Sequence, residues 1–446
     1  MVKEMITYDY KNILKISYPL MLAMLIQVLV GVTDTAFLGR VGEIELGASA
    51  LGGVIYFFVF MLAQSFAVGA QIIMARRNGE KNYVKIAHVF YQTINFLILL
   101  SVVSIGFFYF YAPCILDYII KDEAVKFAVL TYLLPRSWGL LFTSMMTVFR
   151  SFFVAINNTR AIFIVSIIML VSNFIFDYWL IFGGLGIEPM GLAGAAVASI
   201  FAEASALIFF VSFLIIKIGI FKYGFHKFLL WKQSLFNNIF RLSIWIMIQN
   251  LLNWGSWLYF FVEIEKIGAD ALAISNILRS ICSFPYVIAS ALSVVVSSMV
   301  SNLIGEGKDN EVLPTVKRVI KFGAVPYYIC FVFMCFFPEI ILRIYTNNNN
   351  LINDAIMPFY AMLVPYVFAL PGLIYFYAIC GTGKTKVAMW IEILSSVIYV
   401  ISIRMIIGVF DLGLAWSWTS EFYYYLVMLP ISYYYMRRKK WCCEII

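Results

Sequence analysis

The chain has 446 residues, of which 63% are hydrophobic and only 13% are charged. No soluble globular domain of this size needs such a balance, so the composition indicates a membrane protein. The net charge of +8 comes largely from basic loops between apolar segments. A nucleic-acid partner is therefore not expected, despite the basic character of the chain.

Twelve apolar segments are long enough to cross a bilayer, because about 20 residues span a hydrocarbon core of roughly 30 Å. They lie near residues 13–38, 48–74, 88–112, 124–154, 161–183, 191–216, 237–262, 271–301, 319–341, 355–380, 387–410 and 413–436. The sequence thus predicts an all-α polytopic membrane protein with twelve transmembrane helices.

Lysine and arginine gather in every second loop and at both ends of the chain. Arg76 and Arg77 follow the second segment and Lys217 and Lys222 follow the sixth, whereas the loop at 39–47 is acidic. Because basic residues are retained on the cytoplasmic side, we expect both termini in the cytoplasm. We expect a monomeric, multi-pass protein of the plasma membrane, in a bacterium the inner membrane.

The sequence contains an internal repeat. When Ser17 is placed on Ser243, "ILKISYPLM" aligns with "IFRLSIWIM" without a gap, and Thr159 still falls on Thr385 in the same register. Each half holds six segments, so both halves enter the membrane from the same side and the repeat is parallel.

The repeat predicts two six-helix lobes, residues 1–220 and 237–446, joined by a cytosolic linker at 221–236. The second lobe ends in a basic tail. Transporters built from parallel repeats bind substrate between the halves and expose it to either side in turn. The repeat therefore favours a transport function with alternating access.

Two carboxylates inside the apolar segments belong to the first half alone. In the repeat alignment Asp34 falls on Phe260 and Asp177 falls on Ile403. Each aspartate lies six residues before the outer end of its segment, which places it about 9 Å below that end at a helical rise of 1.5 Å per residue. Equal depth predicts a shared polar pocket.

Asn173 precedes Asp177 by four residues, so both lie on one face of the same helix. An ionised carboxylate in hydrocarbon is costly, and two neighbouring carboxylates raise each other's affinity for a proton. The three residues Asp34, Asp177 and Asn173 are our predicted cation-coupling site, for a proton or a sodium ion. The alternative is that each acid reaches the outer surface or pairs with a structural arginine.

Other polar residues inside the segments are weaker candidates. Glu203 either joins the polar site or satisfies a packed network, and Glu392 is expected to extend to the cytosolic surface. Further polar residues that we expect in a cavity are Glu203, Gln64, Arg150, Asn253 and Arg279, with Glu421, Arg136 and Arg404 as additional candidates. Structural pairing is the alternative for each arginine and for Glu421.

Nothing in the sequence predicts an enzyme, a metal site or a cofactor. The two histidines, His88 and His226, are far apart. The stretch "AICGTGKT" at 378–385 nearly matches a phosphate-binding loop, but Ala378 stands where glycine is expected and the context is membrane helices. We interpret it as a turn.

With these residues in view, the chain resembles the multidrug and toxic compound extrusion (MATE) family over essentially its whole length. The resemblance depends on "SYPLM", "VTDTAFLGRVGEIELGA", "AVGAQIIMARRNGEK" and "NFIFDYWLIFG", set in a twelve-helix repeat. It implies two six-helix bundles around a central cavity and export of amphipathic, often cationic, organic compounds against proton or sodium entry.

Within that family the DinF-like branch is similar in having an acid in helix 1 and Asn-x-x-x-Asp in helix 5, which map onto Asp34, Asn173 and Asp177. The NorM-like branch has further acids in helices 7 and 10, and this sequence departs from it with Asn253 in helix 7. The resemblance therefore favours protons over sodium as the coupling ion. The rival hypothesis is a flippase for lipid-linked sugars or other anionic lipids, which the intramembrane arginines would suit.

Overall fold

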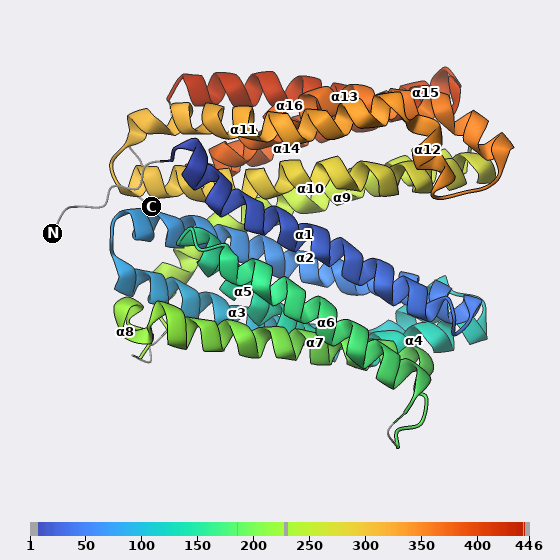
Figure 1. Cartoon of the computed structure of the whole chain (residues 1–446), viewed down its shortest axis with the longest axis horizontal. Helices are drawn as coiled ribbons and strands as arrows, with labels where there is room; N and C mark the ends of the chain where they lie inside the picture. Colours follow the sequence, from blue (N-terminus) through green and yellow to red (C-terminus); the bar gives the residue numbers. More distant parts are fainter. Residues whose placement is uncertain (1–7, 185, 227–230, 440, 442–446) are drawn as a thin grey trace. The chain divides into compact units, whose positions relative to one another are not determined.

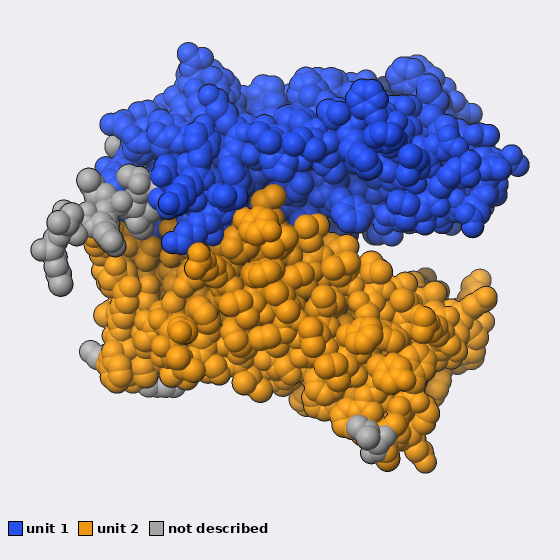
Figure 2. Space-filling model, viewed as in Figure 1, with its two compact units in different colours: residues 1–17, 244–446 blue, residues 18–243 orange. Residues whose placement is uncertain are grey.

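The computed structural model describes residues 8–184, 186–226, 231–439 and 441. Within these ranges the chain is helical, and β-structure is limited to one isolated bridge between Gly184 and Ile187. The chain forms two compact units (Figure 2): residues 18–243, called here the N-terminal unit, and residues 1–17 with 244–446, called the C-terminal unit.

The predicted division at 221–236 differs from the observed one. The boundaries fall at Ser17 and Ser243, which are equivalent positions in the repeat. The first helix of each half therefore begins in the other half's unit.

The N-terminal unit contains α1 from Tyr18 onward and the next seven helices (Figure 1). They are α1 (Tyr10–Leu38), α2 (Glu43–Gly79), α3 (Tyr83–Ile119), α4 (Glu123–Ser137), α5 (Gly139–Ala155), α6 (Arg160–Phe182), α7 (Gly191–Phe213), which continues as a π-helix (Leu214–Ile218), and α8 (Ile220–Tyr223).

The C-terminal unit contains α9 from Ile244 onward and all the later helices. They are α9 (Gln233–Glu265), α10 (Ala269–Gly305), α11 (Asp309–Phe336), α12 (Pro338–Arg343), α13 (Asn349–Gly381), α14 (Thr385–Ile403), which continues as a π-helix (Arg404–Val409), α15 (Gly413–Trp418) and α16 (Ser420–Arg437).

The helices account for the predicted membrane spans. Over the described part of the chain, nine helices are long and apolar enough to cross a membrane, and α4 with α5 makes a tenth span bent by 47°. The other two spans are α9, which is 33 residues long and carries several amides, and α15 with the tyrosine-rich α16. The all-α membrane fold is confirmed.

Three segments predicted as single helices are interrupted. The segment at 124–154 breaks at Trp138, between Pro135, which lacks an amide hydrogen to donate, and Gly139, which weakens a helix interior. The segment at 319–341 breaks before Pro338, and the one at 413–436 breaks at Thr419.

Part of the predicted linker packs onto the N-terminal unit. Tyr223 and Phe225 are buried, and the Tyr91 hydroxyl donates a hydrogen bond of 2.7 Å to the Phe225 carbonyl oxygen. The ring of Phe225 lies 5.1 Å from that of Phe90. Residues 227–230 of the linker lie outside the described ranges.

Helices α6 and α7 approach closely at Gly194. A Cβ atom there would lie 2.5 Å from the Leu180 carbonyl oxygen and 2.7 Å from its carbon. Both distances are shorter than a carbon atom can sustain, and the obstacle is backbone rather than a movable side chain. A glycine at this position is therefore required by the packing.

Gly194→Ala should lower the free energy of unfolding by about 1–3 kcal/mol, because overpacking forces the two helices apart. Gly53→Ala is the matched control, since a Cβ there meets nothing within 4 Å and alanine is the better helix former. Thermal unfolding of the purified variants in detergent measures the difference. Equal melting temperatures for the two variants would show that α6 and α7 are not in this close contact.

Candidate functional site

Asp34 lies in the last turn but one of α1, between two threonines whose hydroxyls are already used. Thr33 donates to the Leu29 carbonyl oxygen at 2.7 Å, and Thr35 donates to the Gly31 carbonyl oxygen at 2.8 Å. Such bonds to the preceding turn satisfy the hydroxyl within its own helix. Asp34 therefore receives no hydrogen bond from its neighbours in sequence.

Asp177 and Asn173 lie one turn apart on α6 and are buried, with 0% and 1% of their surfaces exposed. Aromatic contacts join α6 to α1 beside them. The ring of Phe37 lies 5.3 Å from that of Phe174 and 5.8 Å from that of Phe182. These contacts hold the end of α1 that carries Asp34 against α6.

The structure brings the three residues together, since Asp34 interacts directly with the side chains of Asp177 and Asn173. Four buried oxygens of this cluster lack a hydrogen-bond partner among the described residues: Oδ1 of Asp34, both carboxylate oxygens of Asp177, and Oδ1 of Asn173. A buried acceptor without a donor costs about 1–3 kcal/mol. A proton on one carboxyl would supply the missing donor, and a small cation would neutralise the oxygens directly.

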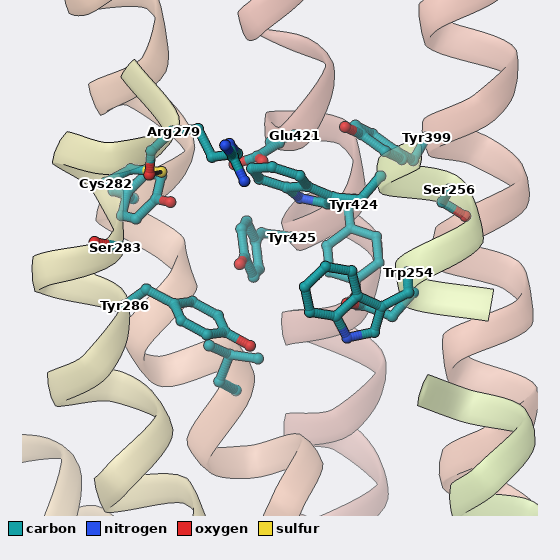
Figure 3. Close-up of a pocket in the computed structure, with 14 residues that line it drawn as sticks. Trp254, Ser256, Arg279, Cys282, Ser283, Tyr286, Tyr399, Glu421, Tyr424 and Tyr425 are labelled. Atoms are coloured by element: carbon teal, nitrogen blue, oxygen red, sulfur yellow. Dashed lines mark hydrogen bonds between the residues drawn. The ribbon is translucent and has the colours of Figure 1, made fainter. Parts of the chain in front are cut away.

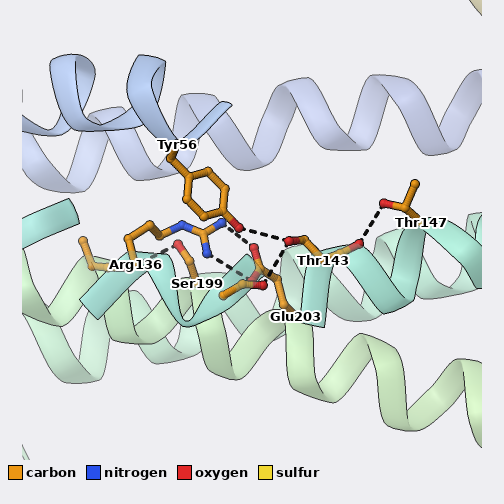
Figure 4. A network of polar contacts seen from close by, with 8 residues as sticks. Tyr56, Arg136, Thr143, Thr147, Ser199 and Glu203 are labelled. Carbon is orange, nitrogen blue, oxygen red and sulfur yellow. Dashed lines mark hydrogen bonds and ion pairs between the residues drawn. The ribbon is translucent and has the colours of Figure 1, made fainter. Parts of the chain in front are cut away.

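A second polar network lies in the same unit, on α2, α4, α5 and α7 (Figure 4). Arg136 forms a two-pronged ion pair with Glu203: its Nη1 donates to Oε2 at 3.1 Å and its Nη2 donates to Oε1. The guanidinium lies over the Tyr56 ring at 4.1 Å, and the Tyr56 hydroxyl lies 3.1 Å from that of Thr143. Glu203 thus belongs to a packed network, one of the two alternatives stated for it.

This ion pair bears on the aspartate cluster. Arg136 lies near enough to Asp34 to act on it electrostatically, but its hydrogen bonds go to Glu203. Among the described residues, no ion pair involves Asp34 or Asp177. The alternative that a structural arginine pairs with either aspartate is therefore wrong for this structure.

The remaining predicted residues divide between the units. Gln64 and Arg150 are half-buried on α2 and α5, and no hydrogen bond among the described residues joins either to the aspartates. Arg404 is exposed at the start of the second π-helix. Asn253 and Arg279 are in the C-terminal unit, where they line a cavity.

That cavity is lined by side chains of α9, α10, α13, α14 and α16 and has a volume of about 260 Å³ (Figure 3). Half of its lining residues are aromatic, one is an acid and one is a base: Asn253, Trp254, Ser256, Trp257, Arg279, Cys282, Ser283, Tyr286, Tyr366, Leu373, Tyr399, Glu421, Tyr424 and Tyr425.

The expectation that Glu392 reaches the surface is wrong. Its side chain is buried, with 2% exposed, and the Tyr424 hydroxyl lies 2.9 Å from both of its carboxylate oxygens. Ser396 donates to Oε1 at 3.2 Å, and Asn253 is near both groups, at 3.2 Å from the Tyr424 hydroxyl. Neutral donors therefore satisfy this acid inside the unit.

Tyr424→Phe should lower the free energy of unfolding by about 1–3 kcal/mol, because Glu392 loses its closest donor while staying buried. Tyr423→Phe is the matched control on the same helix, since Tyr423 is exposed. Thermal unfolding in detergent compares the two. Equal melting temperatures for Tyr424→Phe, Tyr423→Phe and the unmodified protein would refute the importance of this hydrogen bond.

Sequence reasoning missed Tyr424 and the other cavity tyrosines. Glu421, Tyr424, Tyr425 and Met428 are all buried, and they follow the spacing that places residues on one face of a helix. That spacing was the available signal. It was obscured because the chain has 28 tyrosines and few of them line a cavity.

Comparisons with known proteins agree with this architecture. A family model described as MatE matches the chain twice, over residues 19–179 and 246–406, once in each half. A probable multidrug resistance protein NorM from Thermotoga maritima is 24% identical over 425 residues, which cover 93% of this chain and 89% of that protein. A protein of the same name from Agrobacterium fabrum is 28% identical over 302 residues, which cover 67% and 64%.

Solved structures show the same fold. A multidrug resistance MATE family transporter in an outward-facing conformation superposes with a TM-score of 0.88 at 16% identity, covering 96% of this chain and 95% of the other. A transporter from Pyrococcus furiosus, described as having a binding pocket of reverse polarity, superposes with a TM-score of 0.87 at 16% identity, covering 96% and 95%.

Proposed function

Because the chain belongs to the MatE family of membrane transporters, we propose that it exports amphipathic, often cationic, organic compounds by antiport with protons. Family membership confirms the resemblance and the expectation of a transporter rather than an enzyme. The names of the relatives support multidrug compounds as the cargo.

The observation that supports proton coupling is the cluster of four buried, unpaired oxygens on Asp34, Asp177 and Asn173. One proton placed between the two carboxyl groups converts an acceptor into a donor and removes one of two adjacent negative charges. A single proton needs no further ligands, whereas a metal cation takes several oxygen ligands in a defined geometry. A proton therefore fits the cluster better than sodium.

The proposed cycle uses the difference in charge between the two states of the cluster. Protonation from outside removes a negative charge at Asp34 or Asp177, near the end of α1. This helix contains Pro19 and can bend there, since proline removes a helical hydrogen bond. The bent state releases the substrate outward, and proton release to the cytoplasm restores the straight state. Only a ligand that binds the two states unequally can drive such a change, and the proton meets that condition.

The test is transport by the purified protein in liposomes loaded with ethidium, an aromatic organic cation. An imposed pH gradient should drive ethidium movement in the absence of sodium, and an imposed sodium gradient at equal pH should not. Ethidium movement that requires the sodium gradient would overturn the choice of proton. Movement under neither gradient would overturn antiport of such cations.

One observation keeps the flippase hypothesis as a second candidate, since Arg279 lines the cavity of the C-terminal unit. Two observations weigh against it: Arg136 is neutralised by Glu203, and Arg279 shares its cavity with the acid Glu421. An anionic fluorescent lipid, measured by dithionite bleaching in the same liposomes, should not cross faster than in protein-free liposomes.

A further inference from the structure

We propose that the cavity of the C-terminal unit binds an aromatic zwitterion, a ring compound carrying one amine and one carboxylate. This inference rests on the proposed export function and deepens it, because it names a class of substrate and the residues that recognise it. It uses none of the residues assigned above to proton coupling.

The walls of the cavity suit an aromatic ring. Side chains of Trp254, Tyr286, Tyr366, Tyr424 and Tyr425 line it, and hydrogen bonding to Glu392 holds Tyr424 in place. An apolar cavity of roughly 150 Å³ is enough to bind benzene. A volume of about 260 Å³ therefore admits one aromatic ring system with a short charged arm.

The cavity is also lined by one negative and one positive group, Glu421 and Arg279, and no ion pair joins them. Glu421 is buried, with 7% exposed, and none of the ion pairs among the described residues includes it or Arg279. The Trp257 side chain interacts with the Glu421 carboxylate, but this buried carboxylate has no cationic partner among the described residues, which is costly. A ligand amine at Glu421 would provide that partner.

The contacts of Arg279 with the protein hold its guanidinium in place but use few of its N–H donors. Its Nη2 donates to Oδ1 of Asn276 at 3.3 Å, and its guanidinium lies 5.6 Å from the Phe261 ring. A guanidinium has five N–H donors in a planar fork that matches a carboxylate. Donors therefore remain for a ligand carboxylate.

A third polar group lies at the same end of the cavity. In Figure 3, Arg279, Glu421 and Tyr399 lie toward one end, whereas Tyr286 and Trp254 lie toward the other. Tyr399 is 3% exposed, and its hydroxyl has no hydrogen-bond partner among the described residues. A buried hydroxyl of this kind discriminates in favour of a ligand that can pair with it.

The pair of opposite charges selects for a zwitterion over singly charged compounds. A ligand with only an amine is attracted by Glu421 and repelled by Arg279, and a ligand with only a carboxylate meets the reverse. Such unfavourable contacts with the wrong ligand are a common source of specificity. A zwitterion finds a favourable partner for each charge.

Three indole compounds of similar size test this on the purified full-length protein in detergent, by isothermal titration calorimetry at pH 7. L-tryptophan is the zwitterion, tryptamine carries only the amine, and indole-3-propionate carries only the carboxylate. L-tryptophan should bind at least about tenfold more tightly than either of the others, a difference of about 1.4 kcal/mol. Equal affinities, or no binding of any of the three, would overturn the proposal.

Two variants assign the charges. Glu421→Gln should abolish the preference for L-tryptophan over indole-3-propionate, and Arg279→Gln should abolish the preference over tryptamine. The matched controls are Glu339→Gln and Arg343→Gln, which break an exposed ion pair of the same unit and should keep both preferences. The readout is a ratio within one protein, and if a variant fails to fold, the ratios of the unmodified protein still decide.

Failure of this inference is distinguishable from failure of the proposed function. Loss of charge preference, combined with ethidium transport driven by a pH gradient, would overturn the zwitterion site and leave proton antiport standing. The predicted preferences, combined with no response to a pH gradient, would establish the site and overturn proton antiport.

Discussion

Asp34→Asn should reduce transport driven by a pH gradient to below about a tenth of the rate of the unmodified protein, because coupling requires a ligand that distinguishes two states. An asparagine preserves the size of the side chain but cannot take up or release a proton. Asp177→Asn should have the same effect. The measurement is the initial rate of ethidium movement in liposomes with an imposed pH gradient and matched protein content.

Asp117→Asn is the control for this experiment, since Asp117 is exposed and pairs with Lys126 near the end of α3. It should transport at the rate of the unmodified protein. Melting temperatures of all three variants separate a loss of coupling from a loss of structure. Transport by folded Asp34→Asn at the unmodified rate would contradict the role given to this carboxyl group.

Glu203→Gln should lower the free energy of unfolding by about 3–5 kcal/mol, because it leaves the buried guanidinium of Arg136 without its partner. Only 11% of the Arg136 side chain and 1% of the Glu203 side chain are exposed. Replacing both residues, as Arg136→Met with Glu203→Leu, should cost much less, since well-packed apolar groups substitute for a buried ion pair. Thermal unfolding in detergent measures each variant.

The exposed pair of Arg343 and Glu339 provides the comparison. Its nitrogen and oxygen lie 2.7 Å apart, with 51% and 58% of the side chains exposed, so Arg343→Met should cost no more than about 1 kcal/mol. A loss for Glu203→Gln as small as that for Arg343→Met would show that Arg136 reaches solvent or another partner.

Helical periodicity accounts for what could be predicted of the acid cluster. Asp34 and Asp177 stand out because each interrupts a long apolar segment, and the spacing of Asn173 from Asp177 places the two on one helix face. Equal depth in the membrane then suggested that α1 and α6 bring them together. Each of these steps depends on one helix at a time, which is why the sequence was sufficient.

Pairing between helices was beyond such reasoning. Arg136 and Glu203 are 67 residues apart, and nothing in either segment specifies the other. Glu392 was expected at the surface because only its distance from the helix end was considered. The direction of the Glu392 side chain depends on Tyr424, 32 residues later. The hydrogen bond from Tyr424 compensates the cost of burying the carboxyl group.

The interruptions of the long helices show a similar limit. Pro135 and Pro338 are visible in the sequence, but proline also occurs inside unbroken helices of this chain, as at Pro19 and Pro285. Whether the helix continues depends on the groups that satisfy the freed carbonyl oxygens. Such groups can come from neighbouring helices, so the sequence around the proline does not specify them.

Proton release on substrate binding tests the central claim most directly. Ethidium is added to the purified protein in weakly buffered detergent solution near neutral pH, and the change in pH is recorded with a dye indicator. The unmodified protein should release protons in proportion to the ethidium bound, and the double variant Asp34→Asn with Asp177→Asn should release none. Equal release by both proteins would contradict the assignment of the exchanged proton to this cluster.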